Sequence, residues 1–425
     1  MGERAEILSH RGRDCIAMGN PALENMQKYW KNPWSNDNPS GFINMSTADN
    51  NLCRDLIMEK FSEAHFSNLL RNEHIFRYNN PGGMPDTIQT FSKFVARYFN
   101  SEEKIAEENL TVVPGITAGF DMVGAAVCDA HDVFLCPSPF YLRIRNNFEG
   151  RAQVKILPVS MINENSDGHF KLSVEAVSQA YQDANSKGLR VRGLLIVNPN
   201  NPLGCVTPPK TLLELMNYAK SKKLIVLLNE IYALSTFDFD STFKSVLSYY
   251  SQVPDPQRTI WMWGMSKDFC MPGARFGCLY SKNEQIIQCV RQLQMLQPTS
   301  AIVEHALCKF VSDYDWIDRY LVTNHERLRN AFVVVSKRLN EMSVPHTKTE
   351  AGFFTLIDLR KFLKEQTFDA ERKLEAIFQR NGVFLISGEL QYCAQPGWFR
   401  LVFTGNPQAL QEGLNRIEKS LYENW

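Results

Sequence analysis

The sequence predicts an α/β fold in which helices sandwich a mostly parallel sheet, together with a smaller α+β domain. Three observations predict it. Between Leu110 and Ser281, short runs of β-branched and aliphatic residues alternate with stretches of helical periodicity. From about Val344 onward, strands and helices mix without that regular alternation. The length of 425 residues exceeds what one small core needs and suits a large domain plus a smaller one.

The N-terminal part should contribute little to the sheet. Residues 1–50 are rich in Asn, Pro, Gly and Trp, which predicts an irregular arm with little regular structure. A helical pattern then runs from about residue 54 to 75. Turn residues follow at 79–83, and a second helix is expected from Thr87 towards Phe99.

The central part supplies the sheet. Its candidate strands are Leu110–Val113, Val133–Cys136, Val154–Pro158, Gly193–Val197, Leu224–Leu228, Thr259–Trp263 and Phe276–Ser281. Helical patterns lie between them at Ala118–Cys128, Ser173–Asn185 and Pro209–Lys220. Strand–helix alternation of this kind is typical of a parallel sheet with helices on both faces.

The C-terminal part begins with a long helical region from Gln285 to about Met342, broken near Pro298 and Asp313–Asp315. Strands are expected at Phe353–Ile357 and Phe399–Phe403. We therefore expect an arm and part of the small domain in residues 1–75, a large domain in 76–300 and a small domain in 301–425.

Composition excludes several classes of protein. The 46 basic and 46 acidic residues balance, so no broad positive field favours a nucleic-acid partner. The first fifteen residues lack the apolar core of a secretory signal, and no apolar run is long enough to span a bilayer. The ten cysteines are scattered without CxxC spacing, which predicts no metal site and fits a reducing compartment. We expect a cytoplasmic protein without a membrane partner.

Polar side chains follow three of the predicted strands. Asn198-Pro-Asn-Asn-Pro-Leu-Gly follows the first, and Asn229-Glu-Ile-Tyr follows the second. Gly264-Met-Ser-Lys-Asp follows the third, with Pro272-Gly-Ala-Arg just beyond it. Ligands of open parallel sheets bind beyond the carboxyl ends of the strands. These segments should therefore present an amide, a phenol, a lysine and an arginine to one crevice.

Four motifs in this chain resemble those of a known family. SKDxxxPGxRxG, NPxNPLG, NEIY and GWFR resemble fold type I enzymes that depend on pyridoxal 5′-phosphate (PLP), in the class I aminotransferase group. The resemblance is strongest to 1-aminocyclopropane-1-carboxylate (ACC) synthase and ACC synthase-like proteins, and runs from Ala48-Asp49-Asn50 to Arg400. It implies a PLP cofactor, an amino acid as small-molecule substrate, and a homodimer.

The resemblance assigns the central role to Lys267, which would hold PLP as an internal aldimine. A primary amine is needed because its imine exchanges with the amine of the substrate. Partial burial beside other cations should lower its pKa and keep the amine neutral. Once displaced, the same amine can carry the Cα proton. Tyr232 is the second catalytic candidate.

The cofactor phosphate should be held from two sides. Arg275 resembles the family's phosphate-binding arginine, and Ser266 would add a hydroxyl. Ile116 and Thr117 lie in a glycine-containing turn that opens a helix, where backbone N–H groups and the helix dipole favour an anion.

Other residues would hold the cofactor ring and the substrate. Asn201 and Tyr232 match residues that bond the phenolic oxygen of PLP, and Asn201 also belongs to the substrate site. Phe140 matches the aromatic residue that stacks on the ring, with Tyr141 as a close rival. Arg400 resembles the arginine that clamps the substrate α-carboxylate.

Four positions depart from the family pattern. The family has an aspartate where this chain has Asn229, which can bond the ring nitrogen of PLP but carries no charge to keep it protonated. Asp49, in the substrate site, is one methylene shorter than the glutamate of ACC synthases. Pro81 lies near the position of a tyrosine that crosses the dimer interface, for which Tyr78 is a candidate substitute. Gly264 replaces a hydroxyl residue at the phosphate.

Several functions stay open from the sequence. We favour a PLP-dependent enzyme acting at Cα of an α-amino acid, by transamination or elimination. A PLP-binding protein of weakened activity with a regulatory role is the alternative that Asn229 favours. An ACC synthase-type lyase is disfavoured by the departures, and a relative without cofactor is disfavoured by Lys267 and Arg275. The substrate and the choice between these reactions cannot be read from the motifs.

Overall fold

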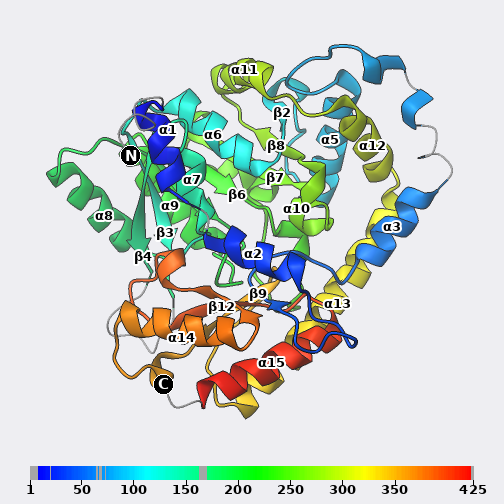
Figure 1. Cartoon of the computed structure of the whole chain (residues 1–425). Coiled ribbons are helices and arrows are strands. Elements are labelled where there is room, and N and C mark those ends of the chain that lie inside the picture. Colours follow the sequence, from blue (N-terminus) through cyan, green and yellow to red (C-terminus); the bar gives the residue numbers. More distant parts are fainter. Residues whose placement is uncertain are drawn as a thin grey trace.

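A seven-stranded sheet forms the centre of the molecule (Figure 1). The computed structural model describes residues 8–19, 21–63, 66, 69–71, 73–161 and 170–422. The strands are β2 (Leu110–Val113), β3 (Val133–Ser138), β4 (Lys155–Ser160), β5 (Val191–Val197), β6 (Ile225–Asn229), β7 (Thr259–Gly264) and β8 (Gly277–Tyr280). Their order is β2-β8-β7-β6-β5-β3-β4, and only β8 runs against its neighbours. The seven predicted strands and the mostly parallel sheet are confirmed.

Helices cover both faces of this sheet. One face carries α6 (Ile116–Val127), α7 (Arg143–Glu149) and α11 (Glu284–Leu293). The other carries α5 (Pro85–Tyr98), α8 (Val174–Ser186), α9 (Pro209–Ser221), α12 (Ala301–Val311) and the start of α13 (Tyr314–Glu341). The breaks predicted near Pro298 and Asp313 separate α11, α12 and α13.

Side chains of the central strands alternate between these two layers. In β6, Leu227 packs on the side of α6, whereas Val226 and Leu228 pack on the side of α9. All three are buried, because a parallel sheet covered on both faces leaves neither row of side chains in water. The strand sequence is therefore apolar throughout rather than alternating.

A smaller antiparallel sheet follows the long helix α13. Its strands are β9 (Phe354–Asp358), β11 (Ile386–Ser387) and β12 (Trp398–Val402), in the order β11-β12-β9. Helices α14 (Phe368–Arg380) and α15 (Pro407–Leu421) pack beside it. β1 (Ile43–Asn44) pairs in parallel with β10 (Val383–Phe384), which joins the N-terminal segment to this C-terminal layer. The exact domain boundaries remain a prediction.

Two predictions for the N-terminal part were wrong. Residues 1–50 are not simply irregular, because the segment contains α1 (His10–Ala17) and α2 (Pro21–Lys31). Helix α2 begins with a proline at its first position, has Glu24 in its first turn and ends with basic residues, all of which suit a helix. The helix expected over 54–75 ends early: α3 spans Arg54–Ser62, and two short 3₁₀ turns occupy Leu69–Arg71 and Glu73–Phe76.

No described helix is long and apolar enough to cross a bilayer. The described part of the chain contains no group of three or more His, Cys, Asp or Glu side chains arranged to hold a metal ion.

Candidate active site

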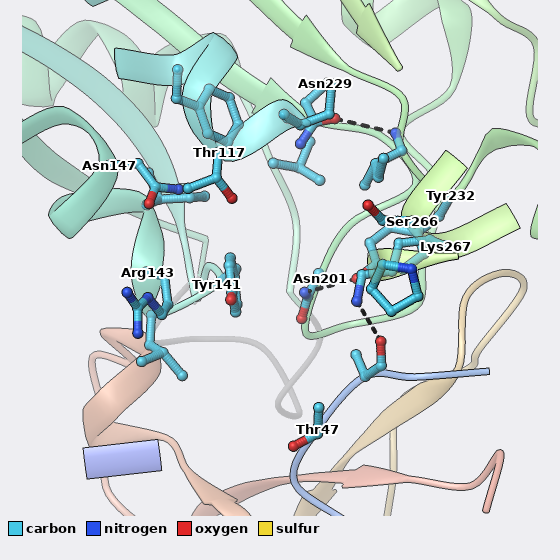
Figure 2. A pocket seen from close by; sticks show the side chains of 18 of the residues that line it. Thr47, Thr117, Tyr141, Arg143, Asn147, Asn201, Asn229, Tyr232, Ser266 and Lys267 are labelled. Atoms are coloured by element: carbon cyan, nitrogen blue, oxygen red, sulfur yellow. Dashed lines mark hydrogen bonds between the residues drawn. The ribbon is translucent and has the colours of Figure 1, made fainter. Parts of the chain in front are cut away.

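A cavity of about 360 Å³ lies where the parallel strands of the large sheet end (Figure 2). Because β8 is antiparallel, its amino end lies at the same edge as the carboxyl ends of β5, β6 and β7. β12 and the segment after β1 close the cavity from the other side. Nine predicted site residues line it together: Ile116, Thr117, Asn201, Asn229, Tyr232, Ser266, Lys267, Arg275 and Arg400.

Lys267 lies in α10 (Met265–Asp268), the single turn that follows β7. Its Nζ donates a hydrogen bond to the backbone oxygen of Ala48 at 2.5 Å and lies 3.8 Å from Oδ1 of Asp49. Burial lowers the pKa of the Lys267 amine, the carboxylate of Asp49 opposes this, and the cationic side chains of Arg400 and Arg275 add to the lowering. The result is an amine that loses its proton more readily than an exposed lysine.

Arg400 is central in β12 and almost fully buried. Its Nη1 donates to Oδ1 of Asn201 at 2.8 Å, and its Nη2 donates to the backbone oxygen of Ser46 at 2.5 Å. Its Nε is buried with no hydrogen-bond partner among the described residues. A buried cation that faces only neutral acceptors is costly, and an anion bound in the cavity would relieve that cost.

Asn201 connects Arg400 to Tyr232. While its oxygen accepts from Arg400, its Nδ2 donates to the hydroxyl of Tyr232 at 3.2 Å. Burial raises the pKa of Tyr232, so the phenol keeps its proton. The phenol therefore has a hydrogen left to donate into the cavity.

The N-terminus of α6 and the segment before β8 form one end of the cavity. Gly115 caps α6 with φ of 82°, and a Cβ atom there would lie 2.5 Å from Nη2 of Arg275. The Arg275 guanidinium is thus held against the helix N-terminus, beside Thr117 and Ser266. Such a combination of a fork-shaped cation, hydroxyls and helix N–H groups suits a phosphate. A side chain at Gly264 would meet the backbone oxygen of Phe276 at 2.7 Å, which explains why no hydroxyl residue stands there.

Asn229 ends β6 and is buried at the floor of the cavity. Its Oδ1 accepts the N–H of Ile231 at 3.2 Å. The Nδ2 group of the amide has no hydrogen-bond partner among the residues that the structure describes, so this position offers a ligand a donor and no charge.

The two candidates for the stacking residue, Phe140 and Tyr141, lie in different surroundings. Phe140 does not line the cavity: it is buried and stacks on Tyr392 at 4.6 Å between ring centroids. Tyr141, the rival, lines the cavity instead. The bend after β3 directs the two neighbouring rings to different sides, which the sequence could not specify.

Two further predicted positions, Asp49 and Tyr78, are not among the residues that line this cavity. Asp49 lines an adjoining cavity rather than this one, with only its carboxylate near Lys267. Tyr78 is fully exposed and is not among the residues of the cavity.

Sequence reasoning missed several residues of the site. Leu23 and Met26 of α2 line the cavity, as do Arg143 and Asn147 of α7. The backbone oxygens of Ser46 and Ala48 were also missed, because no sequence motif indicates where a backbone carbonyl will point. For Arg143 a signal existed: it follows the aromatic pair at the end of β3, at the same edge as the other strand ends.

Comparisons with known proteins identify the family. A family model described as aminotransferase class I and II matches residues 42–417. The bovine (Bos taurus) 1-aminocyclopropane-1-carboxylate synthase-like protein 1 is 36% identical over 99% of this chain and 84% of its own length. A human (Homo sapiens) relative named "probable inactive 1-aminocyclopropane-1-carboxylate synthase-like protein 2" is 34% identical over 98% of this chain and 74% of its own.

Solved structures support the fold. The aromatic aminotransferase from Pyrococcus horikoshii superposes with a TM-score of 0.77 at 21% identity, covering 89% of this chain and 95% of that one. The family match spans most of the chain, and its residues include both the strand-end motifs and Arg400. The chain therefore belongs to the class I and II aminotransferases, with pyridoxal 5′-phosphate as its cofactor and ACC synthase-like proteins among its relatives.

Proposed function

We propose that the protein is an enzyme that uses PLP bound to Lys267 to act at Cα of an α-amino acid, by transamination or by elimination at the side chain. One observation carries the proposal: the buried amine of Lys267, with its lowered pKa, shares a cavity with Arg400, whose Nε lacks a partner among the described residues. A reactive amine and a carboxylate-binding cation in one cavity are what α-amino acid chemistry requires.

The residues present fit the cofactor. When bound, PLP supplies an electron-withdrawing ring that stabilises negative charge at Cα. Arg275 and the N-terminus of α6 would hold its phosphate, Asn229 its ring nitrogen, and Tyr232 with Asn201 its phenolic oxygen.

Three side chains of the protein have separate roles toward the substrate and the cofactor. Arg400 binds the α-carboxylate through its planar fork and so fixes the orientation of the Cα–H bond. Neutral Lys267 takes the Cα proton at Nζ, and its lowered pKa makes the neutral amine easier to form than on an exposed lysine. Tyr232, which stays protonated, holds a hydrogen bond to an oxygen in the cavity throughout.

A second candidate is a PLP-binding protein with weak or no turnover and a regulatory role. Asn229 favours it, since an amide cannot hold a positive charge on the ring nitrogen as a carboxylate does. The relative named "probable inactive" is consistent with it. An ACC synthase-type lyase is less well supported, because the short carboxylate of Asp49 faces Lys267 from outside the cavity.

We also propose a cytoplasmic homodimer. The exposed side chain of Tyr78 would then be available to a second copy. Sedimentation of the purified protein tests the assembly.

The test of the proposed function is chemical. The protein is saturated with PLP, reduced with borohydride and digested, and the label is located by mass spectrometry. We expect the label on Lys267, its loss in Lys267→Ala, and its retention in Lys210→Ala, an exposed lysine of α9. A parent protein without label would overturn the proposal.

Turnover is measured separately. A separate sample of the parent, saturated with PLP but not reduced, is supplied with a panel of α-amino acids, and release of keto acid or ammonia is followed. Release supports the enzyme, whereas label without release from any amino acid supports the second candidate.

A further inference from the structure

One cation in the cavity has no role in the chemistry described so far. Arg143 is the first residue of α7, is half-buried and lines the cavity. Figure 2 shows it beside Tyr141, on the side of the cavity away from Lys267 and Asn201.

The charges around the cavity leave Arg143 unmatched. The cavity is lined by four cationic residues, Arg143, Lys267, Arg275 and Arg400. The described residues that line it include no acidic side chain. Under the proposed function, Lys267 holds the cofactor, Arg275 its phosphate and Arg400 the substrate α-carboxylate. Arg143 therefore has no anion assigned to it.

The described residues supply Arg143 with no partner. Its guanidinium makes no hydrogen bond or ion pair with another described residue, whereas Arg145, two positions on, donates two hydrogen bonds to Glu149 at 2.7 and 2.9 Å. Arg143 is close enough to the site for its charge to act there. Burial raises the pKa of the Tyr141 hydroxyl, and the charges of Arg400 and then Arg143 oppose that rise. Tyr141 thus feels both guanidinium groups.

We propose that Arg143 binds the anionic end of the substrate side chain, so that the protein selects acidic α-amino acids. This inference rests on the proposed function, because it takes Arg400 to hold the α-carboxylate. A guanidinium binds a carboxylate with two parallel hydrogen bonds, which gives both charge and shape selection. The neutral amide analogue of the same ligand would leave the partly buried cation unpaired.

The test uses binding, so it does not depend on turnover. PLP-loaded protein is titrated by calorimetry with succinate and glutarate, and with their monoamides succinamate and glutaramate. The parent should bind the better diacid about 10- to 100-fold more tightly than its monoamide, the range of a charge-assisted hydrogen bond. Arg143→Gln should abolish this preference, Arg143→Lys should keep part of it, and Arg145→Gln should leave it intact.

Three results would overturn the proposal: equal binding of diacid and monoamide by the parent, a preference that survives in a folded Arg143→Gln, or a preference lost equally in Arg145→Gln. The dissociation constant of PLP is measured for each variant. A weaker PLP complex with intact preference would mean that Arg143 serves the cofactor phosphate instead. Failure of the proposed function gives a different pattern, namely no keto acid or ammonia released, with the diacid preference still present.

Discussion

Gly115 and Arg275 touch across the end of the cavity: a Cβ atom on Gly115 would lie 2.5 Å from Nη2 of the arginine. Gly115→Ala should therefore displace the guanidinium and weaken PLP binding by about tenfold or more, the effect of losing one ionic contact. Fluorescence titration with PLP measures it.

Gly188→Ala is the matched control. Gly188 also has a positive φ, of 70°, but a Cβ atom there meets nothing within 4 Å. Backbone strain should cost Gly188→Ala about 1–2 kcal/mol of stability. It should cost Gly115→Ala about 1–3 kcal/mol, because φ of 82° with ψ of 159° is a conformation found almost only in glycine. Only Gly115→Ala should lose PLP affinity. Equal PLP affinities in the two variants would contradict the phosphate role of Arg275.

Asn229→Asp should speed removal of the Cα proton. Oδ1 of Asn229 accepts a hydrogen bond from the N–H of Ile231. A carboxylate can keep that bond with one oxygen and direct its second oxygen into the cavity. The added charge would hold the ring nitrogen protonated, worth about 1.5–3 kcal/mol, or roughly 10- to 100-fold in rate. Exchange of the Cα hydrogen in D₂O, followed by NMR, measures this; an unchanged or slower exchange would argue against a limiting role for Asn229.

Covalent attachment of PLP should depend on pH through Lys267. Its neutral amine is the reactive form, and its pKa lies below that of a free lysine, so the attachment rate should rise as pH increases through that lowered pKa and then level off. Asp49 raises the pKa of Lys267, so Asp49→Asn should shift the rate profile to lower pH. Asp240→Asn, an exposed aspartate outside the cavity, should leave the profile unmoved. A shift of the profile to higher pH in Asp49→Asn would contradict the inference that the Asp49 carboxylate raises the pKa of Lys267.

The two neighbouring aromatic residues should separate in their effects. Tyr141→Leu removes the ring that lines the cavity and should weaken PLP binding by about 2- to 10-fold, equivalent to a stacking energy of about 0.5–1.5 kcal/mol. Phe140→Leu loses its contact with Tyr392 and should lower the melting temperature with PLP affinity retained. PLP titrations and thermal melts of both variants decide which ring stacks on PLP. Loss of PLP affinity in Phe140→Leu but not in Tyr141→Leu would identify Phe140 as the stacking residue.

The sheet could be predicted because its strands are buried on both faces. Runs such as Leu224–Leu228 are apolar throughout and are followed by polar turn residues, so each strand and its end are visible in the chain. Helix α2 was hidden by composition: Pro21 and the tryptophan near its end suggested a loop, although proline at the first helical position favours a helix.

The site could be predicted where a motif carries a side chain to a strand end, as at Lys267, Asn201 and Arg275. It could not be predicted where tertiary packing decides. The carbonyl of Ala48 reaches Lys267 from a residue 219 positions earlier in the chain, and no local pattern encodes that contact. Arg143 likewise comes to line the cavity only when α7 packs against the end of the sheet.

The pairing of β1 with β10 constrains the order in which the protein can mature during synthesis. The segment that brings Ala48 to Lys267 is anchored through Ile43 to Val383, and Arg400 lies further on still. A nascent chain released only as far as β8 would carry the lysine and the phosphate end without the opposite wall. Binding of the substrate α-carboxylate through Arg400 therefore has to wait until β12 has left the ribosome, although the residues assigned to the vitamin B6 cofactor are synthesised earlier.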